Sequence, residues 1–120
     1  MNVDSVATWH EGADRHWLLA TAKEGDVLHL FDAASGEFVR DIGKAGTGPG
    51  EFDRPNGITV IDDLLVVVER DNRRVQVLSL PDFRPLAVFG ADQLIKPYGI
   101  YVRPLGDDRF EFYVTDNYET

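Results

Sequence analysis

Two stretches of the chain share one pattern: "RPNGITVIDDLLVVVERDNRRVQVLSL" from Arg54 and "KPYGIYVRPLGDDRFEFYVTDNYE" from Lys96. Each begins with Pro-x-Gly and an apolar residue, and continues as an alternating strand, a tight acidic turn and a second β-rich strand. Val67 and Val114 fall in matching strands and are 47 residues apart. A strand-based repeat of roughly 40 to 50 residues is typical of propeller blades. The internal repeat therefore predicts consecutive blades of a β-propeller.

The spacing divides the chain into three modules, at about residues 3–43, 44–90 and 91–120, the last of them truncated. We predict an all-β fold of four-stranded antiparallel blades, an incomplete propeller of about two and a half blades. The whole ring, for which we expect six blades, would need further blades or self-association. The predicted strands are 3–9, 17–22, 27–32 and 37–42 in the first module, and 56–61, 64–69, 74–80 and 84–89 in the second.

Turn chemistry supports these boundaries. Asp62-Asp63 and Asp107-Asp108 are predicted hairpin turns, because Asp tolerates the turn backbone and hydrogen-bonds to it locally. The glycine-rich stretch "GKAGTGPGEFDRPNGI" lacks the Lys-Ser/Thr that a phosphate-cradling loop needs after its last glycine. We interpret it as the crossover between two blades, anchored between the sheets by Phe52 and Pro55.

Composition limits the classes of function. The net charge is −9, with 21 acidic and 12 basic residues, so a phosphate backbone would be repelled and nucleic-acid binding is not expected. No apolar run approaches the ~20 residues that cross a membrane, and no membrane association is expected. The chain has no cysteine, which excludes disulfides and thiolate metal sites. An acidic surface is compatible with hard cations such as calcium, and equally with solubility alone.

The middle module resembles an NHL repeat. The resemblance lies in Gly-x-Gly-x-x-Phe-x-x-Pro-x-Gly, a strand, an acidic turn, and the "NRRVQV" segment from Asn72. It implies a propeller fold and leaves the function open. In this segment Arg74 is expected to form a surface ion pair with Glu69 or Asp71, which would contribute little to stability.

Nearly the whole chain resembles the opening blades of the β-propeller phytases, in "DSVATW", "ATAKEGDVLHLFD", "RDNRR" and "PYGIYVRPLGDDRFEFYVTD". The resemblance implies a calcium-dependent phosphohydrolase of phytate, an anionic phosphorylated small molecule, and a secreted or periplasmic location. It assigns phosphate contacts to Lys23, Arg73 and Tyr98, and calcium contacts to Asp4. Asp116 and Asn117, at a predicted strand end near the rim, are further candidate metal ligands.

The chain departs from the phytase pattern at three places. Ile95 and Lys96 stand where an acidic pair is expected, and the second-blade acidic residue is replaced around Gly57. The expected Lys-Glu after Thr115 is also missing. Divalent cations bridging an anionic substrate would reconcile the acidic chain with phytate, because a bound ion reverses the local charge and lowers the pKa of an attacking water.

Two other functions stay open on the sequence. The chain could belong to a non-catalytic NHL-type interaction platform, or to a lactonase-type propeller hydrolase that acts on sugar acids. Each candidate site residue also has a structural interpretation: Asp4 as an entry-turn residue, Lys23 and Arg73 as exposed turn residues, and Tyr98 as a core residue. We expect the 120-residue piece alone to be inactive and to self-associate through unpaired sheet faces.

Overall fold

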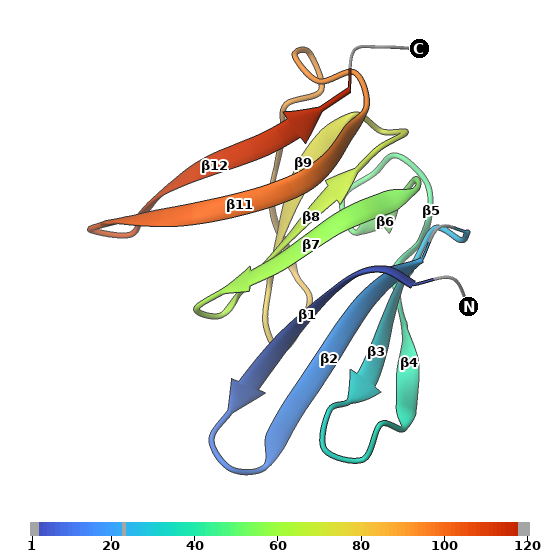
Figure 1. Cartoon of the computed structure of the whole chain (residues 1–120), viewed down its shortest axis with the longest axis vertical. Helices are drawn as coiled ribbons and strands as arrows, with labels where there is room; N and C mark the ends of the chain where they lie inside the picture. The colour runs from blue at the N-terminus through green and yellow to red at the C-terminus, as the bar shows by residue number, and fades with distance from the viewer. Residues whose placement is uncertain (1–2, 23, 118–120) are drawn as a thin grey trace.

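The computed structural model describes residues 3–22 and 24–117, and over these residues the chain is built from β-strands (Figure 1). The first four-stranded antiparallel sheet is formed by β1 (Val3–Glu11), β2 (Arg15–Ala22), β3 (Leu28–Asp32) and β4 (Phe38–Ile42), in that order. The second contains β7 (Pro55–Ile61), β8 (Leu64–Glu69), β9 (Arg74–Ser79) and β10 (Pro85–Phe89). A hairpin of β11 (Pro97–Gly106) and β12 (Arg109–Asp116) follows.

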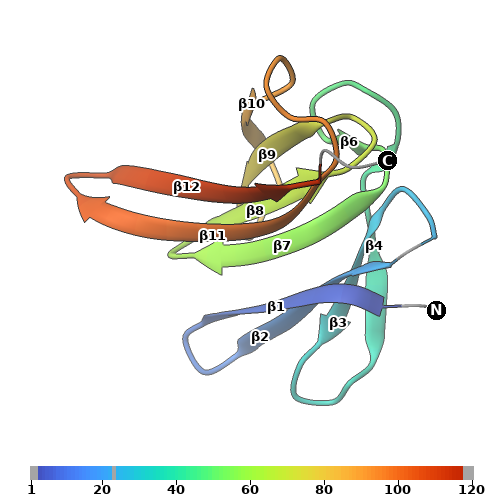
Figure 2. The ribbon, with the colours of Figure 1, turned by 45° about the horizontal axis from the view of Figure 1, so that its top comes forward.

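Each sheet runs in chain order from an inner to an outer strand, which is the arrangement of a propeller blade. The inner strands β1, β7 and β11 lie one after another across the molecule, and β7 contacts both of the others (Figures 1 and 2). The predicted fold class is therefore confirmed: the described residues form two complete blades and the inner hairpin of a third. None of them forms a helix long and apolar enough to span a membrane.

Two apolar layers hold the blades together. Between the first and second blades lie Trp9, Leu19, Leu30, Phe52, Leu65 and other buried residues. Between the second blade and the hairpin lie Val66, Val68, Val75, Val77 and Val102. Strand alternation explains the division, because successive side chains of β8 point alternately to the two layers. The second blade is thus buried on both faces, which accounts for its continuous run of Val and Leu.

The acidic pairs lie in the hairpin turns, as predicted. Asp62, Asp107 and Asp108 have positive φ angles of 51°, 52° and 57° in the turns that join β7 to β8 and β11 to β12. Such angles are uncommon outside glycine and best tolerated by Asp and Asn. Asp63 has a further role, since its Oδ1 accepts a hydrogen bond of 3.0 Å from Nε1 of the buried Trp9. That contact joins the turn of the second blade to the first.

The glycine-rich stretch crosses from the first blade to the second, as predicted. It contains a short parallel pair, β5 (Lys44–Ala45) with β6 (Glu51–Phe52), which the sequence did not predict. Phe52 is fully buried in the layer between the blades. A Cβ atom on Gly43 would lie 2.4 Å from its ring. The buried Phe52 side chain therefore anchors the crossover, and the absence of a side chain at Gly43 leaves room for the Phe52 ring.

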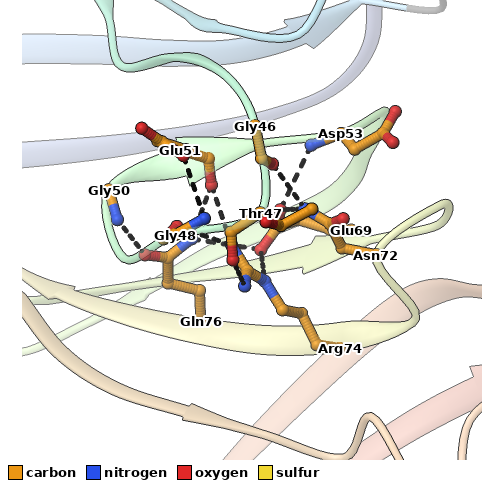
Figure 3. A network of polar contacts seen from close by, with 10 residues as sticks. All are labelled: Gly46, Thr47, Gly48, Gly50, Glu51, Asp53, Glu69, Asn72, Arg74 and Gln76. Carbon is orange, nitrogen blue, oxygen red and sulfur yellow. Dashed lines mark hydrogen bonds and ion pairs between the residues drawn. The ribbon is translucent and has the colours of Figure 1, made fainter.

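Beneath the crossover lies a buried polar network (Figure 3). Its centre is the carboxylate of Glu69, which is fully buried. This carboxylate accepts four hydrogen bonds, from Nε of Arg74 (2.6 Å), Nε2 of Gln76 (3.1 Å), Nδ2 of Asn72 (2.8 Å) and the backbone N–H of Asp53 (3.2 Å). Its acceptor capacity is fully used, which is what a buried charge requires.

The same side chains bind the crossover loop. The guanidinium of Arg74 donates to the carbonyl oxygens of Thr47 (2.6 Å), Gly48 (3.0 Å) and Glu51 (2.9 Å). The predicted ion pair of Arg74 with Glu69 is present, but its predicted place at the surface is wrong: the side chain of Arg74 is 8% exposed and that of Glu69 is 0% exposed. The physical reason is that the crossover folds back over the start of β9 and excludes water from the pair. The Asn-x-Arg-x-Gln pattern of the NHL-like segment therefore holds the crossover against the second blade.

Candidate functional site at the inner strands

Each of the three inner strands has a β-bulge directly after its first residue pair. The register shifts between Val3 and Ser5 in β1, between Pro55 and Gly57 in β7, and between Pro97 and Gly99 in β11. The residues skipped by these shifts are Asp4, Asn56 and Tyr98. A bulge of this kind takes one residue out of the ladder and redirects its side chain. Asp4, Asn56 and Tyr98 are therefore equivalent positions in three consecutive blades.

The glycine after each of the last two bulges allows the strands to approach closely. A Cβ atom on Gly57 would lie 2.5 Å from the carbonyl oxygen of Tyr98, so β7 and β11 touch through their backbones. A Cβ atom on Gly99 would lie 2.6 Å from Oγ1 of Thr115, which accepts a 2.8 Å hydrogen bond from the Gly99 N–H. The repeated Pro-x-Gly pattern thus has a steric cause. Its middle residue is the bulge residue.

Two cavities open at this end of the inner strands, each of about 380 Å³. The first, which we call the acidic cavity, is lined by Asp4, Ser5, Asn56, Gly57, Ile58, Tyr98, Gly99 and Ile100. The second, which we call the cationic cavity, is lined by Asn56, Arg70, Lys96, Tyr98 and Asn117. Asn56 and Tyr98 line both cavities, so the two are neighbours with a shared wall.

Among the described residues, the lining of the cationic cavity has two positive side chains and no carboxylate. The Arg70 side chain is 35% exposed, and its Nε lies 3.3 Å from Oδ1 of Asp71. The alignment is too poor for a hydrogen bond, and this buried Nε has no hydrogen-bond partner. Within residues 3–22 and 24–117, the ammonium group of Lys96 has no ion-pair partner. Lys96 therefore has its full charge available for an anionic ligand, and Arg70 shares its charge with a single partly exposed carboxylate.

Arg70 and Asn117 occupy equivalent places in their blades. Arg70 follows Glu69, which pairs with Pro55, and Asn117 follows Asp116, which pairs with Pro97. Arg70 and Asn117 are 47 residues apart, the same spacing as Val67 and Val114. This spacing could have identified Arg70 as the counterpart of Asn117. In the sequence, Lys23 comes directly after Ala22, the residue that pairs with Val3. Lys23 itself lies outside the described residues.

The other predicted phosphate contacts separate in space. Tyr98 lines both cavities and is 52% exposed, so it is not a core residue. Arg73 lies in the exposed turn between β8 and β9 with a φ of 53° and lines neither cavity. Arg70, three residues earlier, lines the cationic cavity in its place. Asn56 and Lys96 are further lining residues that sequence reasoning did not select as contacts.

Asp116 acts as a cap for the loop before β11. Its Oδ1 accepts the backbone N–H of Lys96 (2.7 Å), and its Oδ2 accepts that of Ile95 (3.0 Å). The N–H of Asn117 donates to the carbonyl oxygen of Lys96 (3.2 Å). These bonds fix the loop that presents Lys96 to the cationic cavity. Each carboxylate oxygen of Asp116 therefore already accepts at least one backbone hydrogen bond.

The predicted calcium ligands do not make a calcium site among themselves. Asp4 lines the acidic cavity and Asn117 the cationic one, while Asp116 is occupied as a cap. Over the described parts of the chain, no three His, Cys, Asp or Glu side chains are grouped so that they could hold a metal ion. Calcium prefers six to eight oxygen ligands. Most of the ligands for such an ion would have to come from outside the described residues.

A cluster of carboxylates lies on the rim next to Arg70. Burial raises the pKa of Asp53, and the negative charges of Asp71 and Asp26 raise it further. Asp26 is engaged with the crossover, since its Oδ1 accepts the Arg54 N–H at 2.9 Å. The positive charge of Arg70 therefore lies beside this group of carboxylates, one of which, Asp71, is its ion-pair partner.

Comparison with known proteins supports the propeller architecture. No curated protein matches the sequence. Among solved structures, the chain is similar to hydrazine synthase of Kuenenia stuttgartiensis, with a TM-score of 0.62 and 14% sequence identity over 95% of this chain. The chain spans only 34% of the length of that protein, and at this identity the similarity shows the fold alone. The DUF5128 family, described as a 6-bladed β-propeller, matches residues 3–119. The chain therefore belongs to this family of 6-bladed β-propellers.

Proposed function

We propose that the complete propeller binds an anionic, phosphorylated small molecule at the cationic cavity and hydrolyses its phosphomonoester, as a calcium-dependent phytase-like enzyme does. The observation that carries the proposal is the pairing of Arg70 and Lys96 in one cavity whose described lining contains no carboxylate. In a chain with a net charge of −9, two available cations in a concave site are unusual, and an anion is the ligand that they fit.

The geometry supports a division of labour between the lining residues. The guanidinium of Arg70 can bind two oxygens of one phosphate, whereas the ammonium of Lys96 acts as a point charge. The amide of Asn56 and the hydroxyl of Tyr98 are neutral hydrogen-bond donors on the shared wall. Such groups hold the oxygens that do not react and neutralise charge that develops on them.

Hydrolysis requires a water to attack phosphorus, the ester P–O bond to break, and the departing alkoxide to take up a proton. Bound calcium would polarise the phosphoryl group and lower the pKa of that water. Because the described residues do not hold the ion by themselves, the catalytic half of the proposal depends on ligands from other parts of the propeller. The anion-binding half depends only on residues described above.

A non-catalytic propeller is the second candidate. It is favoured by the NHL-like segment, whose Asn72, Arg74 and Gln76 are all engaged in the buried network and not in a site. In the described lining of both cavities, Asp4 is the single carboxylate that could act as a base. Such a propeller would bind the same anion and release it unchanged.

The test is phosphate release from inositol hexakisphosphate by the complete propeller, with calcium and with a chelator. Calcium-dependent release that falls at least tenfold in Arg70→Gln, but not in Arg73→Gln, is the expected result. The two variants remove the same charge from neighbouring turn positions. Binding without release would favour the non-catalytic candidate, and the absence of both would refute the proposal.

A further inference from the structure

We infer that, in the absence of a divalent cation, the site prefers a hydroxylated molecule with its anionic group at one end only, such as a sugar or cyclitol monophosphate. This inference rests on the proposed anion-binding site and names its ligand class. It follows from the pairing of the two cavities, which share Asn56 and Tyr98 but differ in charge. A ligand that spans the shared wall meets cations on one side and a carboxylate on the other.

The cationic side determines where the anion binds. Arg70 and Lys96 are both present there, and the nearest ion-pair partner of Arg70, Asp71, is not part of the lining. An oxyanion in this cavity gains charge-assisted hydrogen bonds that water-exposed cations elsewhere do not offer. The same group in the acidic cavity would face Asp4 and be repelled.

The acidic side selects hydrogen-bond donors. Asp4 is exposed, and among residues 3–22 and 24–117 its carboxylate has neither an ion-pair nor a hydrogen-bond partner. An ionised carboxylate only accepts hydrogen bonds, and the hydroxyls of a polyol donate them. An exposed carboxylate gains little from a cation alone, since such ion pairs are screened by water. Hydroxyl groups are therefore the better match for this cavity.

The shared wall is suited to the ring of such a ligand. Tyr98 is half exposed and provides an aromatic surface, and Asn56 provides one acceptor and two donors beside it. Each cavity has a volume of about 380 Å³, at the small end of the range of ligand sites. All three bulge residues would then contact one ligand: Asp4 its hydroxyls, Asn56 and Tyr98 its ring.

The affinity of the site for a polyol phosphate should depend on how many phosphates the ligand has. A fully phosphorylated polyol places phosphate in both cavities, and without a divalent cation the phosphate near Asp4 is repelled. A monophosphate avoids this repulsion. In the presence of a chelator, the site should therefore prefer the monophosphate, and replacing Asp4 should reverse part of that preference.

The experiment measures binding to the complete propeller by calorimetry with a chelator present, using glucose 6-phosphate, inorganic phosphate and inositol hexakisphosphate. We expect glucose 6-phosphate to bind about tenfold more tightly than inorganic phosphate. Asp4→Asn should reduce this ratio to threefold or less, leave inorganic phosphate unchanged and strengthen inositol hexakisphosphate binding. Arg70→Gln should weaken all three ligands. Asp62→Asn, at the far end of β7, is the matched control.

An unchanged ratio in Asp4→Asn, with the fold intact by circular dichroism, would overturn the inference. A preference for glucosamine 6-phosphate that Asp4→Asn abolishes would also overturn it, because the acidic cavity would then be selecting an amine. Failure of phosphate release with this binding pattern intact would refute only the proposed catalysis. The two proposals can therefore fail separately.

Discussion

Glu69 and Arg70 are neighbours in the chain but belong to opposite kinds of polar region. Glu69 is fully buried under the crossover, and four donors satisfy it. Arg70 faces the cationic cavity, with a poorly aligned contact to Asp71. The first region consists of the residues that make the sequence recognisable as a repeat, whereas the second lies at positions where the repeat varies. Recognisable motif residues here maintain the blade, and the variable ones are free for ligand recognition.

The largest effect should come from breaking the buried network. Glu69→Ala leaves the Arg74 guanidinium buried without its counter-charge, and loss of one partner of a buried pair costs about 3–5 kcal/mol. Chemical denaturation of the propeller measures this as a decrease in the free energy of unfolding. Arg73→Ala, in the exposed turn nearby, should change it by less than about 0.5 kcal/mol. A mild effect of Glu69→Ala would mean that water reaches the pair.

The next effect tests the close contact between the inner strands. Gly57→Ala places a Cβ 2.5 Å from a backbone oxygen of β11, which cannot rotate away, and overpacking of this kind costs about 1–3 kcal/mol. Gly99→Ala meets a threonine side chain instead and should cost less, because that side chain can adopt another rotamer. Thermal unfolding of both variants compares them. Equal costs would contradict a backbone-to-backbone contact.

Removing a charge from the cationic cavity should weaken anion binding and leave the free energy of unfolding nearly unchanged. Arg70→Gln removes charge-assisted hydrogen bonds to the anion, a loss of roughly 1.5–3 kcal/mol of binding, which corresponds to tenfold or more in affinity. The free energy of unfolding should stay within about 0.5 kcal/mol of the parent, since the Arg70–Asp71 contact is partly exposed. Titration with inorganic phosphate gives the first quantity and denaturation the second. Equal binding by parent and variant would remove Arg70 from the site.

The smallest effect concerns pH. Because burial and the charges of Asp71 and Asp26 raise the pKa of Asp53, the folded state binds a proton here more tightly than the unfolded state does. The stability that this proton contributes is present below the ordinary pKa of about 3.8 and is lost as the pH rises through the raised value. Asp53→Asn should abolish this decrease, and unfolding measured from pH 3 to 7 would detect the flatter profile. A steeper dependence of stability on pH in Asp53→Asn would mean that the pKa of Asp53 is not raised in the folded state.

The sequence predicted the blades well because their signals are local. The run of Leu and Val over Leu64–Glu69 and the acidic turn at Asp62 need no knowledge of the neighbouring blade. The strands of the first two blades accordingly begin and end within two residues of the predicted bounds, and the largest differences are at the end of β1 and the start of β2. The anchoring of the crossover by Phe52 also follows from a local pattern.

The site was less predictable, because it depends on pairing between strands. The bulges at Asp4, Asn56 and Tyr98 become visible only when Pro55 is known to pair with Glu69 and Pro97 with Asp116. The resemblance to the phytases favoured Arg73, because it follows Asn72. In the structure Arg70 lines the cationic cavity, whereas Arg73 lies in the exposed turn before β9. The burial of Arg74 was equally invisible, since the covering loop comes from residues more than twenty positions earlier.

The repeated bulge has a consequence for how such a protein can change. A residue that takes no part in the β-ladder can be replaced without disturbing strand register, packing between blades or the crossover. Asp, Asn and Tyr already occupy this position in three successive blades of one molecule. New ligand preferences could therefore be produced one blade at a time, by substitutions that leave folding untouched, and a library randomised at these positions would be a direct way to redesign what the propeller binds.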